Sequence, residues 1–217
     1  MKRLCIAAVL ACLLAGCGYG PSAGEKWAEL TRGERLDQAR YDLTSDNSEA
    51  RRWAVIRLAR AGNVADAMAI AERLDPNRES VPLVRVTAAG AIRVLGERSM
   101  IPTLTRSLRD PDATVRVESA RAIGYLGGAA DVPTLVHTLR NDPDPRVRVE
   151  AAYALRRMGA TEAVPALAAA LEDRDESVVF ASHYALRELT QKELPPFKEY
   201  WLRATPKPEN GSTVNKQ

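Results

Sequence analysis

The feature that most constrains this chain is a motif that occurs four times at a nearly constant spacing. Each copy is a short apolar run rich in alanine, and the copies begin at Val84, Val115, Val147 and Val178. The starting valines lie 31, 32 and 31 residues apart. A fixed period of this size is typical of stacked structural units, because one unit is too small to bury its own apolar face. The spacing therefore predicts an elongated repeat fold, which favours a binding surface over a catalytic cleft.

Each unit contains the pattern of two helices. In the unit that starts at Val115, apolar and small side chains recur on one helical face as far as Leu126. Gly127 follows at a position typical of a left-handed C-cap or a turn. Pro133 suits the first turn of a second helix. The apolar stripe of that helix is Val132, Leu135, Val136 and Leu139.

The units align at several independent positions. Pro102, Pro133 and Pro165 each lie six residues before a leucine, and an aspartate-containing turn follows that leucine in each unit. These residues resemble the HEAT-like repeats of the phycobilin lyase type, with the pattern I-P-x-L-x-x-x-L-x-D-x-D-x-x-V-R-x-x-A-A-x-A-L-x-x-L-G, over residues 36–189. The resemblance implies an all-α fold, an α-solenoid of about five helix pairs in a right-handed superhelix with one continuous core.

The N-terminal segment has the features of an export signal. A basic start precedes an apolar run over residues 4–15, which is too short to span a membrane. The run ends in Leu14-Ala15-Gly16-Cys17, which resembles the lipobox of bacterial lipoproteins. The resemblance implies cleavage after Gly16 and acylation of Cys17. The alternative is an ordinary signal peptide that ends by chance in cysteine.

The same resemblance predicts a location. Gly18 follows the cysteine, where an aspartate would tend to retain a lipoprotein in the inner membrane. In a bacterium with two membranes, this favours the outer membrane, with the body of the protein facing the periplasm.

Cleavage also changes the chemistry of the mature chain. Cys5 and Cys12 would leave with the signal peptide, so Cys17 would be the only thiol. A disulfide framework, a cysteine metal cluster and a thiol nucleophile are then excluded. The formal net charge of +3 loses the two positive charges of Lys2 and Arg3 and becomes +1. A nearly neutral body gives no electrostatic reason to expect a nucleic acid partner.

The rest of the chain divides by composition. The expected segments are a signal peptide (1–16), a lipidated cysteine and tether (17–25), a HEAT-like domain with capping helices at both ends (26–204) and a disordered tail (205–217). Phe197, Tyr200 and Trp201 are expected to cover the open core at the C-terminal end, and Trp27 and Trp53 at the other end. The alternative is that these aromatic side chains form an exposed partner site.

No set of residues suggests catalysis. His137 is expected to be exposed, and His183 to be a hydrogen-bonded residue of the C-terminal cap. They lie in different units, which disfavours a shared metal site. Neither histidine is followed by glutamate, unlike the iron-binding His-Glu pairs of the HEAT-like deoxyhypusine hydroxylases. We therefore predict that the chain is not an enzyme and has no catalytic residues, no cofactor and no metal.

The aspartate pairs in the turns are expected to be structural. Aspartate at a helix start caps free N–H groups and suits the helix dipole, and the turns lack the oxygen ligands of an EF-hand calcium site. Arg85, Arg116 and Arg148, just inside the first helices, are placed to pair with such carboxylates in the same or the next repeat.

The candidate partner-binding surface is the exposed side of the second helices, which the alignment places on a concave face. Such a groove could take a helix or an extended peptide; the alternative is an ordinary solvated surface. The predicted strip consists of Arg73, Thr103, Arg106, Ser107, Thr134, His137 and Thr138.

Three functions follow as hypotheses. The first is a membrane-anchored scaffold that binds a protein or peptide partner in the bacterial envelope. The second is a lyase-type enzyme or enzyme subunit that handles a pigment or other small molecule. The third is a self-associating structural factor in envelope assembly. The absence of catalytic sets favours the first and third, and fold analogy alone supports the scaffold.

Overall fold

The structure is a computed structural model that describes Gly33 and residues 35–204. The described residues form helices joined by short turns, and none of them lies in a β-strand. The predicted segments 1–16, 17–25 and 205–217, together with Trp27, lie outside the described part of the chain. The long helices are α3 (Ser48–Ala61), α5 (Pro82–Leu95), α7 (Ala113–Leu126), α9 (Pro145–Arg157) and α11 (Glu176–Thr190).

A shorter helix precedes each long helix. Several of these short helices begin or end in a 3-10 turn. The helix that precedes α3 covers residues 35–42. The others are α4 (Ala67–Ala71), α6 (Ile101–Ser107), α8 (Val132–Asn141) and α10 (Val164–Ala169), and α12 (Lys198–Ala204) follows α11 at the C-terminal end. The 3-10 turns are Val64–Asp66, Glu72–Leu74, Arg98–Met100, Ala129–Asp131, Thr161–Ala163 and Ala170–Glu172.

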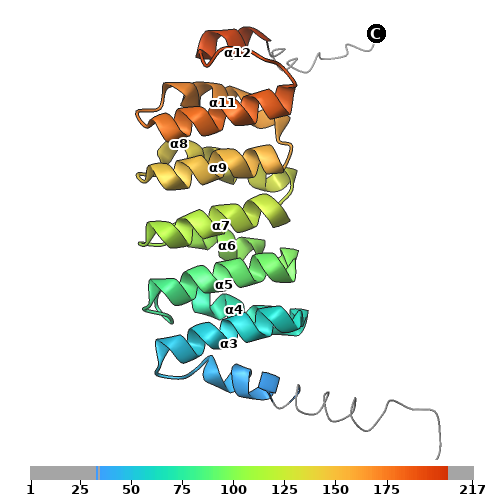
Figure 1. Ribbon diagram of the computed structural model, residues 1–217, viewed down its shortest axis with the longest axis vertical. Coiled ribbons are helices and arrows are strands. Elements are labelled where there is room, and N and C mark those ends of the chain that lie inside the picture. Colours follow the sequence, from blue (N-terminus) through green and yellow to red (C-terminus); the bar gives the residue numbers. More distant parts are fainter. Residues whose placement is uncertain (1–32, 34, 205–217) are drawn as a thin grey trace, which may run out of the picture.

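The helix pairs stack into two layers. The long helices lie side by side in one layer and the short helices lie behind them in the other (Figure 1). The predicted all-α solenoid is therefore confirmed. The predicted unit paired each long helix with the short helix that follows it. In the structure, each of α4, α6, α8 and α10 packs mainly on the long helix that comes after it in the chain.

Small side chains in the core allow this close stacking. Ala88, Ala120 and Ala151 of the long helices are fully buried, and so are the larger Leu104 and Leu135 of the short helices. Each buried aliphatic side chain contributes about 1.5–3 kcal/mol relative to exposure. One apolar core therefore runs along the whole stack.

The short helices are spaced more widely than the long ones. Neighbouring long helices contact one another along their lengths, whereas neighbouring short helices meet at few points. The short helices therefore form the more widely spaced layer, and hollows open between them. That this layer lines a concave face stays a prediction.

The helix ends match the sequence signals with one exception. Gly62, Gly96 and Gly159 have φ angles of 70°, 72° and 67°, the left-handed conformation that favours glycine. Gly127, in contrast, is extended, with φ −72° and ψ 176°. The left-handed C-cap expected there is therefore wrong. Glycine is needed at this position for space, because a Cβ atom would lie 2.7 Å from the Ile123 carbonyl oxygen.

The C-terminal end of the core is covered as expected, but not by all three aromatic residues. Trp201 of α12 is fully buried and donates its indole N–H to the Pro195 carbonyl at 2.8 Å. Phe197 and Tyr200 are exposed. The His183 Nε2 atom lies 2.7 Å from the Leu194 carbonyl oxygen, and the ring packs edge-on against Trp201. The prediction that His183 is a hydrogen-bonded residue of the cap is confirmed.

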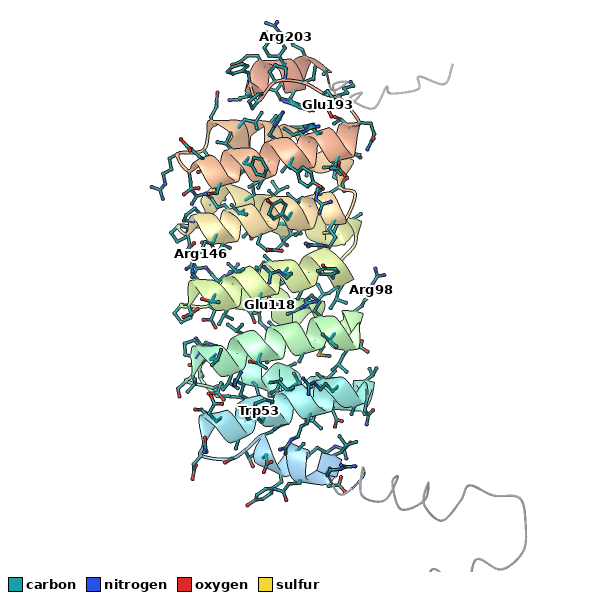
Figure 2. All side chains as sticks on the ribbon, viewed as in Figure 1. Trp53, Arg98, Glu118, Arg146, Glu193 and Arg203 are labelled. Carbon is teal, nitrogen blue, oxygen red and sulfur yellow. The ribbon has the colours of Figure 1, made fainter. Side chains whose placement is uncertain are left out.

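Trp53 does not cap the N-terminal end. Its side chain is exposed on the long-helix layer, where the guanidinium of Arg52 lies 5.4 Å from a ring centroid (Figure 2). The expected cap role is therefore wrong for this residue. The sequence suggested it because α3 lies near the end of the stack. The helix over residues 35–42 packs beyond α3 instead, and it supplies the buried Ala39, while the turn after it supplies the buried Leu43.

Candidate partner-binding site

Four arginines near the starts of long helices hold the frame of the site. In each case Nε and one terminal nitrogen bind both oxygens of a carboxylate in the following turn, at 2.6–2.9 Å. The remaining terminal nitrogen donates to backbone carbonyls of the preceding turn. The pairs are Arg51–Glu79, Arg85–Asp110, Arg116–Asp142 and Arg148–Asp173.

These pairs confirm the prediction for Arg85, Arg116 and Arg148, and each carboxylate lies 25 or 26 residues further along the chain. Two parallel N–H···O bonds fix geometry as well as charge. Each arginine therefore ties the turn before its own long helix to the turn that follows the next short helix. The aspartates that follow in the same turns cap long helices, as predicted. The capping residues are Asp112, Asp144 and Asp175.

Two of these carboxylates, those of Glu79 and Asp173, are stabilised in their charged form. Burial alone would raise the pKa of Glu79, but hydrogen bonds from Arg51 and from the Val81 N–H outweigh burial, and the pKa is lowered from its usual 4.5. Burial alone would also raise the pKa of Asp173. Hydrogen bonds from the Arg148 guanidinium and from the Asp175 N–H outweigh burial, and the pKa lies below its usual 3.8. Glu79 and Asp173 are thus ionised near neutral pH.

The structure brings six of the seven predicted strip residues into two adjoining pockets between short helices. The first pocket, about 480 Å³ in volume, opens between α4 and α6 and is lined by Thr103, Arg106 and Ser107 together with Met68. The second, about 570 Å³, opens between α6 and α8 and is lined by Thr134, His137 and Thr138.

The six residues differ in what they offer a ligand. Arg106 and His137 are exposed, and within the described chain no carboxylate pairs with Arg106. Ser107 and Thr138 are buried, and their hydroxyls donate to the carbonyls of Thr103 and of Thr134 in their own helices at 3.0 Å. The reactive surface of the strip is therefore one guanidinium, one imidazole and the edges of two threonines.

Arg73 does not join the strip. Its side chain is 14% exposed, and Nη1 donates to the Leu43 carbonyl at 3.3 Å. It therefore links the 3-10 turn Glu72–Leu74, just after α4, to the preceding repeat, and it lies outside the residues that line the two pockets.

Arg109 is a pocket residue that sequence reasoning missed. It is exposed just after α6 and lines both pockets, so it connects them. The helical register of the second helices gave no signal for it, because it lies in the turn beyond the helix. Asp110 also borders both pockets, but its two oxygens are bound by Arg85.

No group of three or more His, Cys, Asp or Glu side chains that could hold a metal ion occurs within Gly33 and residues 35–204. The two histidines lie far apart in the stack, one exposed on α8 and one packed under α12.

Comparison with known proteins assigns the class. A family profile described as HEAT repeats matches residues 77–145 and 132–209, more than half of the chain. The chain therefore belongs to the HEAT-repeat family, as the sequence resemblance implied. It matches no curated protein at a significant level.

Two solved structures share the fold. The complex of CpcE and CpcF of phycocyanin lyase from Nostoc sp. PCC7120 is similar at 24% identity and a TM-score of 0.60, over 82% of this chain and 68% of that chain. An engineered protein is similar at 21% identity and a TM-score of 0.51, over 71% of this chain and 79% of that chain. At these identities the similarity establishes the architecture.

The prediction that the chain is not an enzyme is contradicted by this comparison. One of the structures with the same fold is a complex of phycocyanin lyase. The prediction relied on the absence of a recognisable catalytic set, but a stack with the same fold belongs to a lyase complex.

The lipidation residue Cys17 and the signal peptide lie outside the described residues. Among the helices that the structure does describe, none is both long enough and apolar enough to cross a membrane.

Proposed function

We propose that this chain is a lipid-anchored HEAT-repeat protein that binds a protein partner through the strip of pockets between α4, α6 and α8. The observation that carries the proposal is the meeting of Thr103, Arg106, Thr134 and His137 in two adjoining pockets. These residues come from two separate repeats and meet because successive short helices are splayed.

The size and lining of the pockets suit side chains of a partner. Volumes of about 480 and 570 Å³ lie within the range of ligand sites in proteins. Met68 supplies an exposed apolar surface beside the guanidiniums of Arg106 and Arg109. A helix or extended peptide lying across α4, α6 and α8 would place one side chain in each hollow.

The proposed anchor rests on the sequence alone. The lipobox resemblance at Leu14-Ala15-Gly16-Cys17 supports acylation of Cys17, and two or more acyl chains bind a membrane stably, whereas one chain does so only marginally. Gly18 supports the outer membrane, with the repeats facing the periplasm.

The experiment is in-cell crosslinking of the tagged full-length chain in its native host, followed by purification in mild detergent and mass spectrometry. Crosslinks from one partner should map to the α6 and α8 strip. Arg106→Ala with His137→Ala should weaken recovery of that partner about tenfold. Arg146→Ala, an exposed arginine outside the strip, is the matched control. Unchanged recovery with the double variant would refute the binding site.

The anchor is tested separately with Cys17→Ser. This variant should leave the membrane fraction and lose incorporation of labelled fatty acid. A Cys17→Ser chain that stays in the membrane and still carries the label would contradict the lipoprotein assignment.

A second candidate function is a subunit of a lyase-type enzyme that handles a pigment or other small molecule. The similarity to the phycocyanin lyase complex favours it. The test is the absorption spectrum and native mass of the full chain purified from its host. A bound chromophore or small molecule of defined mass would support this candidate, and a protein partner crosslinked at the strip would favour the first.

A further inference from the structure

A second surface lies on the opposite layer of the stack. The exposed side of α5, α7, α9 and α11 carries guanidinium groups and tyrosine rings in direct contact. We call it the arginine–tyrosine face, and it consists of Arg93, Arg121, Tyr125, Arg156, Arg157 and Tyr184.

Two carboxylates lie beneath this face and position its arginines. Glu118 of α7 accepts from Arg93 Nε at 3.2 Å and from Arg121 Nη1 at 2.8 Å, and it lies between α5 and α7 (Figure 2). Glu150 of α9 accepts from Arg121 Nη2 at 2.9 Å, and its other oxygen is 3.7 Å from Arg157 Nη2. The side chains of Glu118 and Glu150 are only 11% and 8% exposed, so solvent meets the guanidiniums rather than the carboxylates.

The tyrosine rings are fixed by the same arginines. The guanidiniums of Arg157 and Arg93 lie 4.2 and 5.2 Å from the centroid of the Tyr125 ring. The Arg156 guanidinium lies 5.1 Å from the Tyr184 ring, which also packs edge-on against Tyr153. Tyr125 remains 55% exposed and Tyr184 37% exposed. Rigid, exposed tyrosine and arginine side chains are the residue types that dominate binding energy at protein interfaces.

The arginine–tyrosine face carries more positive than negative side chains. Arg93, Arg121 and Arg157 share Glu118 and Glu150, and Arg156 makes no ion pair with any described residue. Four guanidiniums therefore stand against two carboxylates. Arg156 Nε, Arg157 Nη1 and Glu150 Oε1 are buried without a hydrogen-bond partner in the described part of the chain. A ligand on this face would therefore meet the exposed parts of the guanidiniums rather than these buried atoms.

We propose that the arginine–tyrosine face binds an extended acidic segment of a partner protein, with carboxylates on the guanidiniums of Arg156 and Arg157 and apolar side chains on Tyr125 and Tyr184. The excess of guanidiniums over carboxylates favours acidic residues in the peptide, and the two exposed tyrosine rings favour apolar residues between them. This surface lies on the long helices and the pocket strip lies on the short helices, so each proposal can be tested independently of the other.

The test measures fluorescence anisotropy of a fluorescein-labelled peptide of alternating glutamate and leucine with the full-length Cys17→Ser chain. The same peptide with glutamine for glutamate is the probe control. The glutamate peptide should bind, and the glutamine peptide should bind at least about tenfold more weakly. Binding of the glutamate peptide should also weaken as salt is added.

The variants separate this face from the rest of the molecule. Arg156→Gln removes a guanidinium that has no carboxylate partner, so the fold should be retained, and circular dichroism checks this. Together with Tyr184→Ala it should reduce affinity about tenfold or more. Arg146→Gln, and the pair Arg106→Ala and His137→Ala on the pocket strip, should leave affinity unchanged.

Equal affinity of the Arg156→Gln, Tyr184→Ala chain and the unmodified chain would overturn the proposal, as would equal binding of the glutamine peptide. Tighter binding of a single-stranded oligonucleotide than of the glutamate peptide would overturn the choice of a protein segment. Loss of peptide binding in the pocket-strip variant alone would assign the peptide to the strip and refute this face.

Discussion

Replacing Arg85 with methionine would test whether the buried arginine–aspartate pairs hold consecutive repeats together. Arg85 is 3% exposed, and the Asp110 side chain is fully buried. Two N–H···O bonds of 2.8 Å join them, and a third nitrogen donates to the Glu79 and Ser80 carbonyls. Methionine keeps much of the volume but removes every one of these donors.

The expected cost follows from this burial. Removing one partner of a buried pair leaves an uncompensated charge, and the typical loss is about 3–5 kcal/mol. Asp110 keeps a single hydrogen bond, from the Asp112 N–H at 2.8 Å, which cannot replace the lost guanidinium. We therefore expect Arg85→Met to lower the free energy of unfolding by about 3 kcal/mol or more.

A double-mutant cycle isolates the pair itself. Asp110→Asn keeps an acceptor for the Asp112 N–H but removes the charge. The chain that carries both Arg85→Met and Asp110→Asn should be more stable than the sum of the single losses predicts, with a coupling of about 1–3 kcal/mol.

The assay is guanidinium denaturation of the Cys17→Ser chain, followed by far-ultraviolet circular dichroism at neutral pH. Arg146→Met is the matched control, because this arginine is 65% exposed and, among Gly33 and residues 35–204, its one ion pair is with Asp144 at the start of its own helix. A loss below about 1 kcal/mol for Arg85→Met, or strictly additive effects in the cycle, would refute the reasoning.

Three further predictions concern packing, capping and pH. Gly124→Ala would place a Cβ atom 2.6 Å from a side chain of α9 and should cost about 1–3 kcal/mol, whereas Gly128→Ala, with open space around it, should change the denaturation midpoint little. Trp201→Ala should cost about 3–5 kcal/mol and loosen α12 in hydrogen exchange, while Phe197→Ala, at an exposed position, should not. Because the folded-state pKa of Glu79 is depressed, its contribution is complete above pH 4.5 and is lost as pH falls below that value. A midpoint denaturant concentration that does not decrease when the pH is lowered from 5 to 3 would contradict the expectation for Glu79.

The repeat pattern alone predicted the parts of the molecule that depend on local spacing. A period near 31 residues places equivalent residues of neighbouring units in contact, so the stack, the capping aspartates and the pairing of Arg85, Arg116 and Arg148 could be read from one unit and applied to the others. The capping role of His183 was predictable because it replaces a small residue where the repeat ends.

The sequence could not decide how far apart the helices of each layer lie. That spacing depends on helix length and on close contacts between units, such as that of Gly124 with α9, which no single repeat contains. It was therefore the tertiary structure that placed the short helices on the splayed side, opened the pockets between them and excluded Arg73 from the strip.

The arginine–tyrosine face has the same origin. Arg121, Arg156 and Arg157 look like ordinary charged residues of separate helices in the sequence. Only the close packing of α7, α9 and α11 brings them over Glu118 and Glu150 and against the tyrosine rings, because contacts between units join residues about one repeat apart. The sequence thus determined the unit and its connections, and the stacking of units decided which side chains meet on each surface.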